Sequence, residues 1–356
     1  MELKPISISK EISRRMSAMS FICACMIVGI HCTPTPSLGS WQWWTVSIFG
    51  ADGLCRIAVP WFFFASGFFL AGHFGEEGWY TREVLKRVKT LLVPFVLWAI
   101  IGLGIGTCMW YGIQKLGYTC GVRSPFESGV ISAFQKALGF DLSRINIGPI
   151  WFLRMLFMLV LVSPIICRLI GCLGFVLPVV VLLGYGVYDT IWHFSDFWEY
   201  LISLRGVAYF VLGATVRCCR ITTGRGFLDA LCHACAVGPI LLVAHGCALR
   251  YGIYHLANVL DFLMVLPIML LVWKFLSCLK LPRFCIENSF ALYVMHSSFL
   301  LVSIAIIAKF GLRAEMDSSI ALALSRWVFA CGCAIMASRC IKWICPLMAD
   351  LLFGGR

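Results

Sequence analysis

One histidine near the start of this sequence is placed where it could do acid–base chemistry. His31 follows the apolar run FICACMIVGI and has no carboxylate within several residues. A neutral imidazole can accept a proton from a hydroxyl near pH 7. The alternative is a structural histidine that forms a hydrogen bond to a neighbouring helix, and for a lone histidine in an apolar segment that role is the more common one.

Two arginines lie at the edge of, or inside, long apolar runs, where a charged side chain must face protein or a water-filled cavity. Arg56 opens the run RIAVPWFFFASGFFL, and it either pairs with Asp52 or helps to bind an anionic ligand. Arg154 lies about one turn beyond Trp151, a residue typical of an anchor at the membrane interface. Arg154 therefore either extends outward to water or lines a cavity that faces the substrate.

A second histidine, His296, lies in the run ENSFALYVMHSSFL. It shares a helical face with Tyr293, because the two residues occupy positions i and i+3 of the same helix. This context favours a hydrogen bond between helices over catalysis. The sequence contains no G-x-S-x-G elbow, no HExxH motif and no other paired set of metal ligands. We therefore expect neither a covalent serine hydrolase nor a metal centre.

A basic stretch, WYTREVLKRVKTLLVPF, leads into the third long apolar run. In a helix, Arg82, Lys86 and Lys89 share one face at i, i+4 and i+7 spacing, with Arg87 beside it. One interpretation is an amphipathic turn that touches anionic lipid. The other is a binding site for a phosphate-bearing substrate, since arginine and lysine bind phosphate through charge-assisted hydrogen bonds.

The elements that must position these residues are long apolar segments. Of the 356 residues, 61% are hydrophobic and 13% are charged, whereas soluble proteins carry about 25% charged residues. A spanning helix needs about 20 mainly apolar residues, so the sequence predicts an all-α, polytopic integral membrane protein with about ten transmembrane helices. They are expected at residues 17–34, 54–72, 91–112, 149–167, 172–188, 199–216, 227–249, 259–278, 287–308 and 319–341.

The chain divides into a cytoplasmic N-terminal segment (1–16), one transmembrane domain (17–344) and a cytoplasmic C-terminal tail (345–356). Lysines and arginines produce the net charge of +12, and they concentrate in alternate gaps between apolar runs. The positive-inside rule then places both termini in the cytoplasm, and binding of nucleic acid is not expected. The longest outer loop, 113–148, could form a lid over an outer cavity, and residues 189–199 form a polar break.

Five motifs in order carry a resemblance to a known family. They are FICACMIVGIHC, RIAVPWFFFASGFFL, KRVKTLLVPF, IWFLRMLF and NSFALYVMH, and together they span most of the chain. The chain resembles the acyltransferase family 3 membrane proteins, which O-acylate bacterial envelope carbohydrates and related molecules. The resemblance implies a multi-pass protein of the bacterial inner membrane. Its expected partners are the lipid bilayer, an acyl-CoA donor and a carbohydrate or glycolipid acceptor.

The resemblance also implies a reaction and roles for individual residues. An acyl group, commonly acetyl, would pass from coenzyme A to a hydroxyl without any bound cofactor, and His31 would be the catalytic base. The basic side chains expected to bind the phosphates of the donor are Arg82, Lys86, Arg87 and Lys89. The candidates for lining the cavity are Arg56, Arg154, Trp151, Ser20 and His296.

The chain departs from the family at one position of the first helix. The family motif is a basic residue, then ten residues, then the histidine, and the basic position is occupied here by Ser20. Ser20 lies on nearly the same helical face as His31 but carries no charge, and Arg14 and Arg15 lie more than a turn further away. Because of this departure, a catalytically inactive relative of the family is one alternative to an active enzyme. A transporter of a lipid-linked or anionic substrate is the other alternative, although the sequence lacks paired broken helices in corresponding halves.

Overall fold

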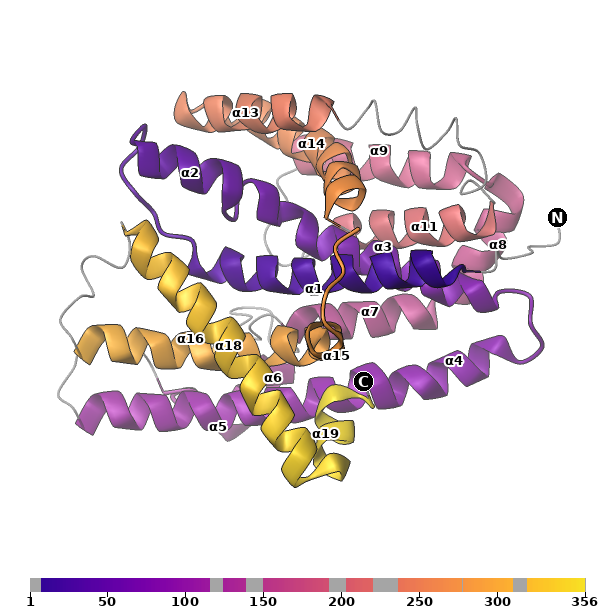
Figure 1. The fold of residues 1–356 in the computed structure, drawn as a ribbon. Coiled ribbons are helices and arrows are strands. Elements are labelled where there is room, and N and C mark those ends of the chain that lie inside the picture. Colours follow the sequence, from indigo (N-terminus) through magenta and orange to yellow (C-terminus); the bar gives the residue numbers. More distant parts are fainter. Residues whose placement is uncertain are drawn as a thin grey trace.

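The computed structural model describes residues 8–115, 124–138, 150–191, 203–219, 236–276, 278–309 and 319–355. These residues are almost entirely helical and none of them forms a strand, which confirms the all-α prediction. Most helices run along a common direction, and one long helix, α18, crosses them obliquely (Figure 1). The elements in chain order are α1 (Lys10–Cys32), α2 (Trp41–Phe49), η1 (Leu54–Ile57), α3 (Ala58–Leu70), η2 (Ala71–His73), α4 (Trp79–Arg87), η3 (Val88–Leu92), α5 (Val93–Lys115), α6 (Val130–Leu138), α7 (Trp151–Leu161), α8 (Ser163–Leu173), α9 (Val176–Ile191), α11 (Leu204–Cys218), α13 (Val237–Arg250), α14 (Tyr254–Phe275), α15 (Arg283–Glu287), α16 (Ser289–Lys309), α18 (Ile320–Ile344) and α19 (Pro346–Phe353).

Fewer helices are long enough to cross a membrane than the apolar runs predicted. Within the part of the chain that the structure describes, five segments are long and apolar enough: Lys10–Cys32, Trp41–His73, Trp79–Gly112, Tyr254–Phe275 and Ile320–Ile344. A sixth is obtained if α7 and α8, which are bent by 61° at their junction, form one span. Each predicted segment contains a helix, but the count of about ten spans is not confirmed.

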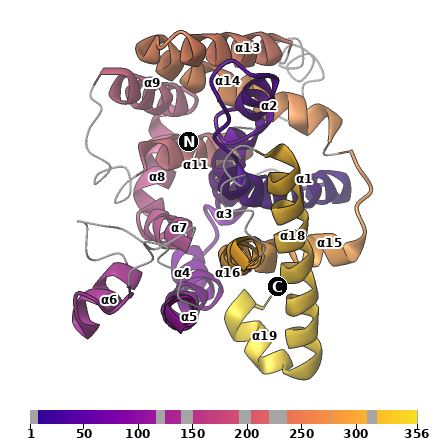
Figure 2. The same ribbon diagram turned by 90° about the vertical axis from the view of Figure 1, so that its left-hand side faces the viewer.

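The remaining apolar helices are short. Helices α9, α11 and α13 contain 16, 15 and 14 residues, which corresponds to about 21–24 Å against a hydrocarbon core of about 30 Å. The bend between α7 and α8 falls next to Pro164, in the first turn of α8, where the missing N–H of a proline breaks no helical hydrogen bond. Most of the predicted polar break at 189–199 and half of the outer loop at 113–148 lie outside the described residues. Helix α6, which belongs to that loop, lies at the rim beside α5 (Figure 2).

Helices α3 and α11 meet backbone to backbone. A Cβ added to Gly67 would lie 2.0 Å from the carbonyl oxygen of Phe210, and one added to Gly213 would lie 2.0 Å from that of Phe64. No residue larger than glycine fits at either contact, which is the way small residues let membrane helices approach closely. The contact fixes the position of α11 along the axis of α3.

A π-helical turn, η3, joins α4 to α5, and the end of the chain packs on it. The indole of Trp98 donates a hydrogen bond to the carbonyl oxygen of Leu352 at 2.9 Å. Gly354 has a φ of 66°, and a Cβ there would lie 2.8 Å from the Cα of Thr90. The segment predicted as a C-terminal tail therefore contains helix α19 and covers the π-helical turn.

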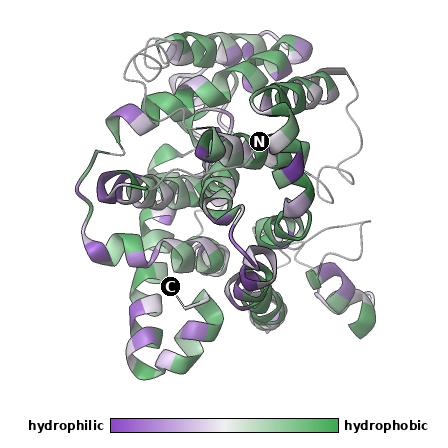
Figure 3. Cartoon of the chain, turned by 90° about the vertical axis from the view of Figure 1, so that its right-hand side faces the viewer, coloured by the Kyte–Doolittle hydropathy of each residue, from purple (hydrophilic) through white to green (hydrophobic). Residues whose placement is uncertain are grey.

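The outer surface of the bundle is apolar. Figure 3 shows hydrophobic residues over most of the helices and only scattered hydrophilic ones. Large exposed apolar side chains include Val180 and Leu183 of α9, Ile240 of α13 and Val328 of α18. Exposed apolar surface on this scale is unfavourable in water and favourable in lipid.

Candidate active site

The two histidines identified in apolar runs lie together. The rings of His31, in the last turn of α1, and His296, in α16, stack with their centroids 5.3 Å apart and their planes at 29°. His31 is exposed at the bundle surface, whereas His296 is fully buried. A hydrogen bond to another helix was the predicted role for His296, but its contact with α1 is instead this stacking on the candidate base.

The protonation of His296 follows from its hydrogen bond. Its Nδ1 lies 2.6 Å from the backbone carbonyl oxygen of Tyr293, and a carbonyl oxygen can only accept, so Nδ1 carries the proton. Nε2 is buried and has no hydrogen-bond partner among the described residues. The bond to Tyr293 thus fixes the ring against which His31 packs.

A cavity of about 610 Å³ lies beside the first half of α1. It is called the α1 cavity here, and it opens at the end of the bundle where α1 begins and where α3 and α11 end. Helices α1, α3, α4, α7, α11 and α16 and the π-helical turn all contribute to its wall. Ser20 and Tyr293 line it, and the Tyr293 ring lies 6.2 Å from that of His296, between their centroids. Tyr293 therefore connects the cavity to the histidine pair.

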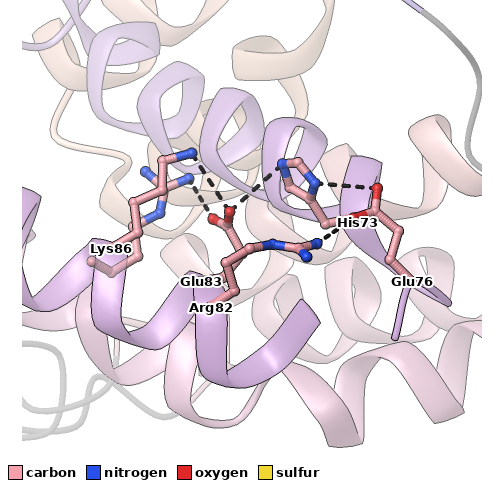
Figure 4. A network of polar contacts seen from close by, with 6 residues as sticks. His73, Glu76, Arg82, Glu83 and Lys86 are labelled. Carbon is pink, nitrogen blue, oxygen red and sulfur yellow. Dashed lines mark hydrogen bonds and ion pairs between the residues drawn. The ribbon is translucent and has the colours of Figure 1, made fainter. Parts of the chain in front are cut away.

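A network of ion pairs surrounds the basic side of the α1 cavity (Figure 4). Glu83 is 2% exposed, and it lies 3.5 Å from Lys86, 3.4 Å from Arg87 and 3.6 Å from the Nε2 atom of His73. A buried carboxylate needs such partners. Arg82 does not contact Glu83 directly but pairs with the exposed Glu76, which joins the network through the Nδ1 atom of His73 at 3.4 Å.

The basic face predicted from helical spacing is divided in the structure. Lys86 and Arg87 line the α1 cavity, but Arg82 and Lys89 are exposed and are not among the residues of its wall. Arg82 precedes the π-helical turn and pairs with Glu76, whereas Lys89 lies within that turn, which begins at Val88. A π-turn contains more residues per turn than an α-helix, so Lys89 is rotated away from the face on which i, i+4 and i+7 spacing would place it.

Ser20 lies in the wall of the α1 cavity, and no arginine of α1 takes its place. Its hydroxyl donates to the carbonyl oxygen of Met16 at 2.9 Å and accepts from the indole of Trp61 at 3.2 Å. Arg15 is directed elsewhere, since its guanidinium donates to the carbonyl oxygen of Trp273 at 3.0 Å and lies 4.5 Å from the centre of that ring. Helix α1 therefore supplies no cation to the cavity wall.

Arg56 belongs to a separate, charge-balanced group. Its guanidinium binds the carboxylate of Asp261 closely and lies 3.7 Å from Asp52. Asp261 is 2% exposed and also accepts a hydrogen bond from Arg205 at 2.8 Å. Two arginines thus share two carboxylates, which leaves no excess charge for an anionic ligand. The pairing with Asp52 was expected, but the closer pairing with Asp261 lies too far along the sequence to be seen there.

The other two cavity candidates lie away from the α1 cavity. The ring of Trp151 packs 6.4 Å from that of Phe63 in the interior, between ring centroids. Arg154 is half-buried one turn further along α7. Neither residue is in the wall of the cavity.

One cavity residue was not identified from the sequence. Arg217, in the last turn of α11, is 8% exposed and lines the α1 cavity. Its guanidinium lies 5.2 Å from the centre of the Phe68 ring, and its Nε has no hydrogen-bond partner in the described part of the chain. In the sequence it resembles any arginine after an apolar run, so only its burial distinguishes it.

Comparison with known proteins gives two matches. A family model described as an acyltransferase domain matches residues 16–341. The succinoglycan biosynthesis protein ExoH of Rhizobium meliloti (strain 1021) is 24% identical over 168 residues, an alignment that covers 45% of this chain and 44% of that protein. The aligned part is thus less than half of either protein. No solved structure matches the chain.

Proposed function

Because the chain belongs to the acyltransferase family 3, and is thus a multi-pass membrane protein and an acyltransferase of groups other than aminoacyl groups, we propose that it acylates a hydroxyl of an envelope carbohydrate. The acyl donor is an acyl-coenzyme A, with acetyl as the simplest acyl group. The bundle lies in a bacterial inner membrane with both termini in the cytoplasm. The name of the relative in succinoglycan biosynthesis supports a polysaccharide or its lipid-linked precursor as the acceptor.

The observation that carries this proposal is the connection between the α1 cavity and the histidine pair. Lys86 and Arg87 supply positive charge at one side of the cavity, and Tyr293 at its wall contacts His296. A donor with phosphates at one end and a thioester at the other fits this order of polar and apolar groups. His31 lies about 16 Å along α1 from Ser20, so the thioester would have to extend past Tyr293 to meet it.

In the proposed reaction His31 acts as the general base. It takes the proton of the acceptor hydroxyl while the hydroxyl oxygen forms a bond to the thioester carbonyl carbon. The carbon–sulfur bond then breaks, and the departing sulfur receives the proton from His31. His296 holds the His31 ring in place through their stacking contact, since its own Nδ1 is committed to the Tyr293 carbonyl.

The direct test is transfer of label. Purified protein in detergent is incubated with acetyl-coenzyme A labelled in the acetyl group and with envelope glycans, and ester-linked label on the glycan is measured. Label on the glycan is expected, and a protein that binds the glycan without transferring label would leave the inactive relative as the better description. The structure gives little support to the transporter alternative. A transporter is expected to have broken helices in both halves, and within the described ranges only α7 and α8 form a broken pair.

A further inference from the structure

The charges around the α1 cavity do not balance at one position. Lys86 and Arg87 both pair with the single carboxylate of Glu83, which also lies next to His73. Arg217 forms no ion pair with any described carboxylate. The acidic residue in the wall of the cavity, Glu287, is exposed and is not paired with it. Among the described residues, Arg217 is thus a cation of the cavity wall that has no ion-pair partner, and it lies on α11, outside the basic stretch that the sequence brings to notice.

An arginine this deeply buried needs a reason. Removing a guanidinium from water is costly unless a counter-charge or several hydrogen bonds replace the water. The contact with the Phe68 ring offsets only part of that cost, because a cation–π contact is weaker than the desolvation of a charge. Arg217 thus resembles a side chain whose partner is a ligand.

The neighbouring backbone leaves space for the guanidinium. Gly72, in the turn after α3, lies so close that a Cβ there would be 3.1 Å from the Nη2 atom of Arg217. The Gly67 and Gly213 contacts hold α3 and α11 in this register. A planar guanidinium packed close to the Phe68 ring and to the backbone of Gly72 has little freedom to turn, which suits bidentate binding of a phosphate.

We propose that Arg217, which lies close to Phe68 and Gly72 in the wall of the α1 cavity, is an anion subsite that binds a phosphate group. The proposal rests on the proposed function where it takes the phosphate to be that of the acyl-coenzyme A donor. The same chemistry is offered by the headgroup of an anionic lipid. With the subsite, a cavity whose α1 wall carries the uncharged Ser20 still presents a cation that is free to bind the donor.

The test measures ligand affinity and stability of the full chain in lipid nanodiscs. The variants are Arg217→Gln and Arg217→Lys, with Arg82→Gln as the matched control, since Arg82 is an exposed arginine outside the cavity. Coenzyme A should bind Arg217→Gln roughly ten- to hundredfold more weakly than wild type. Arg217→Lys should keep part of the affinity, and Arg82→Gln should keep all of it. Without ligand, Arg217→Gln should melt at or above the wild-type temperature, because a buried, uncompensated charge has been removed.

Two outcomes overturn the proposal. Equal affinity of wild type and Arg217→Gln for coenzyme A and for inorganic pyrophosphate would show that no anion binds there. A melting temperature lowered by several degrees in Arg217→Gln, with ligand affinity unchanged, would make the residue structural.

Further measurements distinguish a failure of the proposed anion subsite from a failure of the proposed coenzyme A donor. If pyrophosphate raises the melting temperature of wild type but not of Arg217→Gln, while coenzyme A binds neither, the subsite stands and the coenzyme A donor fails. Nanodiscs of phosphatidylglycerol are compared with nanodiscs of phosphatidylcholine. Stabilisation that depends on Arg217 and on phosphatidylglycerol, and that coenzyme A does not displace, would identify a lipid headgroup as the occupant.

Discussion

At the scale of single residues, the two stacked imidazoles have different surroundings. His296 is closed off from solvent and bonded to the Tyr293 carbonyl oxygen, whereas His31 is exposed at the end of α1. A base must reach its substrate, so His31 is the member of the pair able to exchange a proton with an acceptor. His296 is suited to positioning.

The first prediction concerns His31. A general base contributes about 10²–10⁴-fold to the rate, so His31→Ala should lower transfer by that factor while coenzyme A binding and the melting temperature stay near wild type. His31→Gln should fail equally, because an amide keeps hydrogen-bonding capacity but cannot take up a proton near neutral pH. Initial rates of ester formation measure both variants. Near-wild-type turnover of His31→Gln would remove the catalytic assignment.

The second prediction compares two lysines of the same basic stretch. Lys86 lines the α1 cavity and Lys89 does not, although both are exposed. Lys86→Gln should weaken coenzyme A binding about tenfold or more, the loss of one charged hydrogen bond. Lys89→Gln should change it less than about twofold, since an exposed charge outside the site is screened. Equal effects from the two substitutions would leave only the lipid-contact interpretation of this stretch.

Single residues could be predicted from the sequence by their type and by the energetic cost of placing an ionisable group in an apolar segment. His31, His296 and Arg56 were found because ionisable groups are rare inside apolar runs. Arg217 and Glu83 were missed because each lies in a polar gap, where burial is invisible to composition. The partner of Arg56, Asp261, was missed because a pairing across more than half the chain depends on how α3, α11 and α14 pack.

At the scale of elements, the positions at which helices break influence the number of spans and the placement of the basic side chains more than helix propensity does. The apolar segments predicted helices in the right places, but hydropathy counts residues and does not show where a helix bends. The 61° bend at α7 and α8, the short helices α9, α11 and α13, and α16, whose apolar part counts only from Ser289 to Ile304, account for the difference in span count among the described residues. The π-helical turn explains why Lys89 does not reach the cavity with Lys86 and Arg87.

The third prediction tests the link that joins η1, α11 and α14. Removing one partner of a buried ion pair typically costs about 3–5 kcal/mol, so Asp261→Asn should markedly lower the free energy of unfolding. Asp52→Asn removes the other carboxylate near Arg56, but that side chain is 56% exposed, and an exposed pair contributes about 0–1 kcal/mol. Denaturant titration of both variants in the same detergent measures the difference. Similar stability of the two variants would mean that the link does not hold the bundle together.

At the scale of the whole molecule, the amino-acid composition was sufficient to predict that the chain is a membrane protein. An apolar surface on an all-helical chain is stable in lipid, and the family match over residues 16–341 lies close to the predicted transmembrane domain, 17–344. The direction in which the bundle sits in the membrane depends on the distribution of lysine and arginine, and it stays a prediction.

The fourth prediction tests that orientation. An epitope inserted after Gly129, an exposed position with a φ of 92° before α6, should be stained by antibody in intact spheroplasts. An epitope added after Gly355 should be stained only after the membrane is permeabilised. The positive-inside rule gives this result, since the outer segments together carry 7 lysines and arginines whereas the opposite gaps carry 18. The reverse pattern would invert the topology.

The backbone contact of α3 and α11 makes α11 a stiff rod with a charged group at each end. Arg205 is tied to Asp261 at one end, and Arg217 lies in the α1 cavity at the other, about 18 Å along the axis. A helix held against its neighbour without intervening side chains is fixed in register and moves as one body, so we expect a disturbance at one end of α11 to be transmitted to the other. Communication between the two ends of α11 would then be mechanical. A double-mutant cycle of Asp261→Asn and Arg217→Gln on coenzyme A affinity measures it, and effects that add within about 0.5 kcal/mol would rule it out.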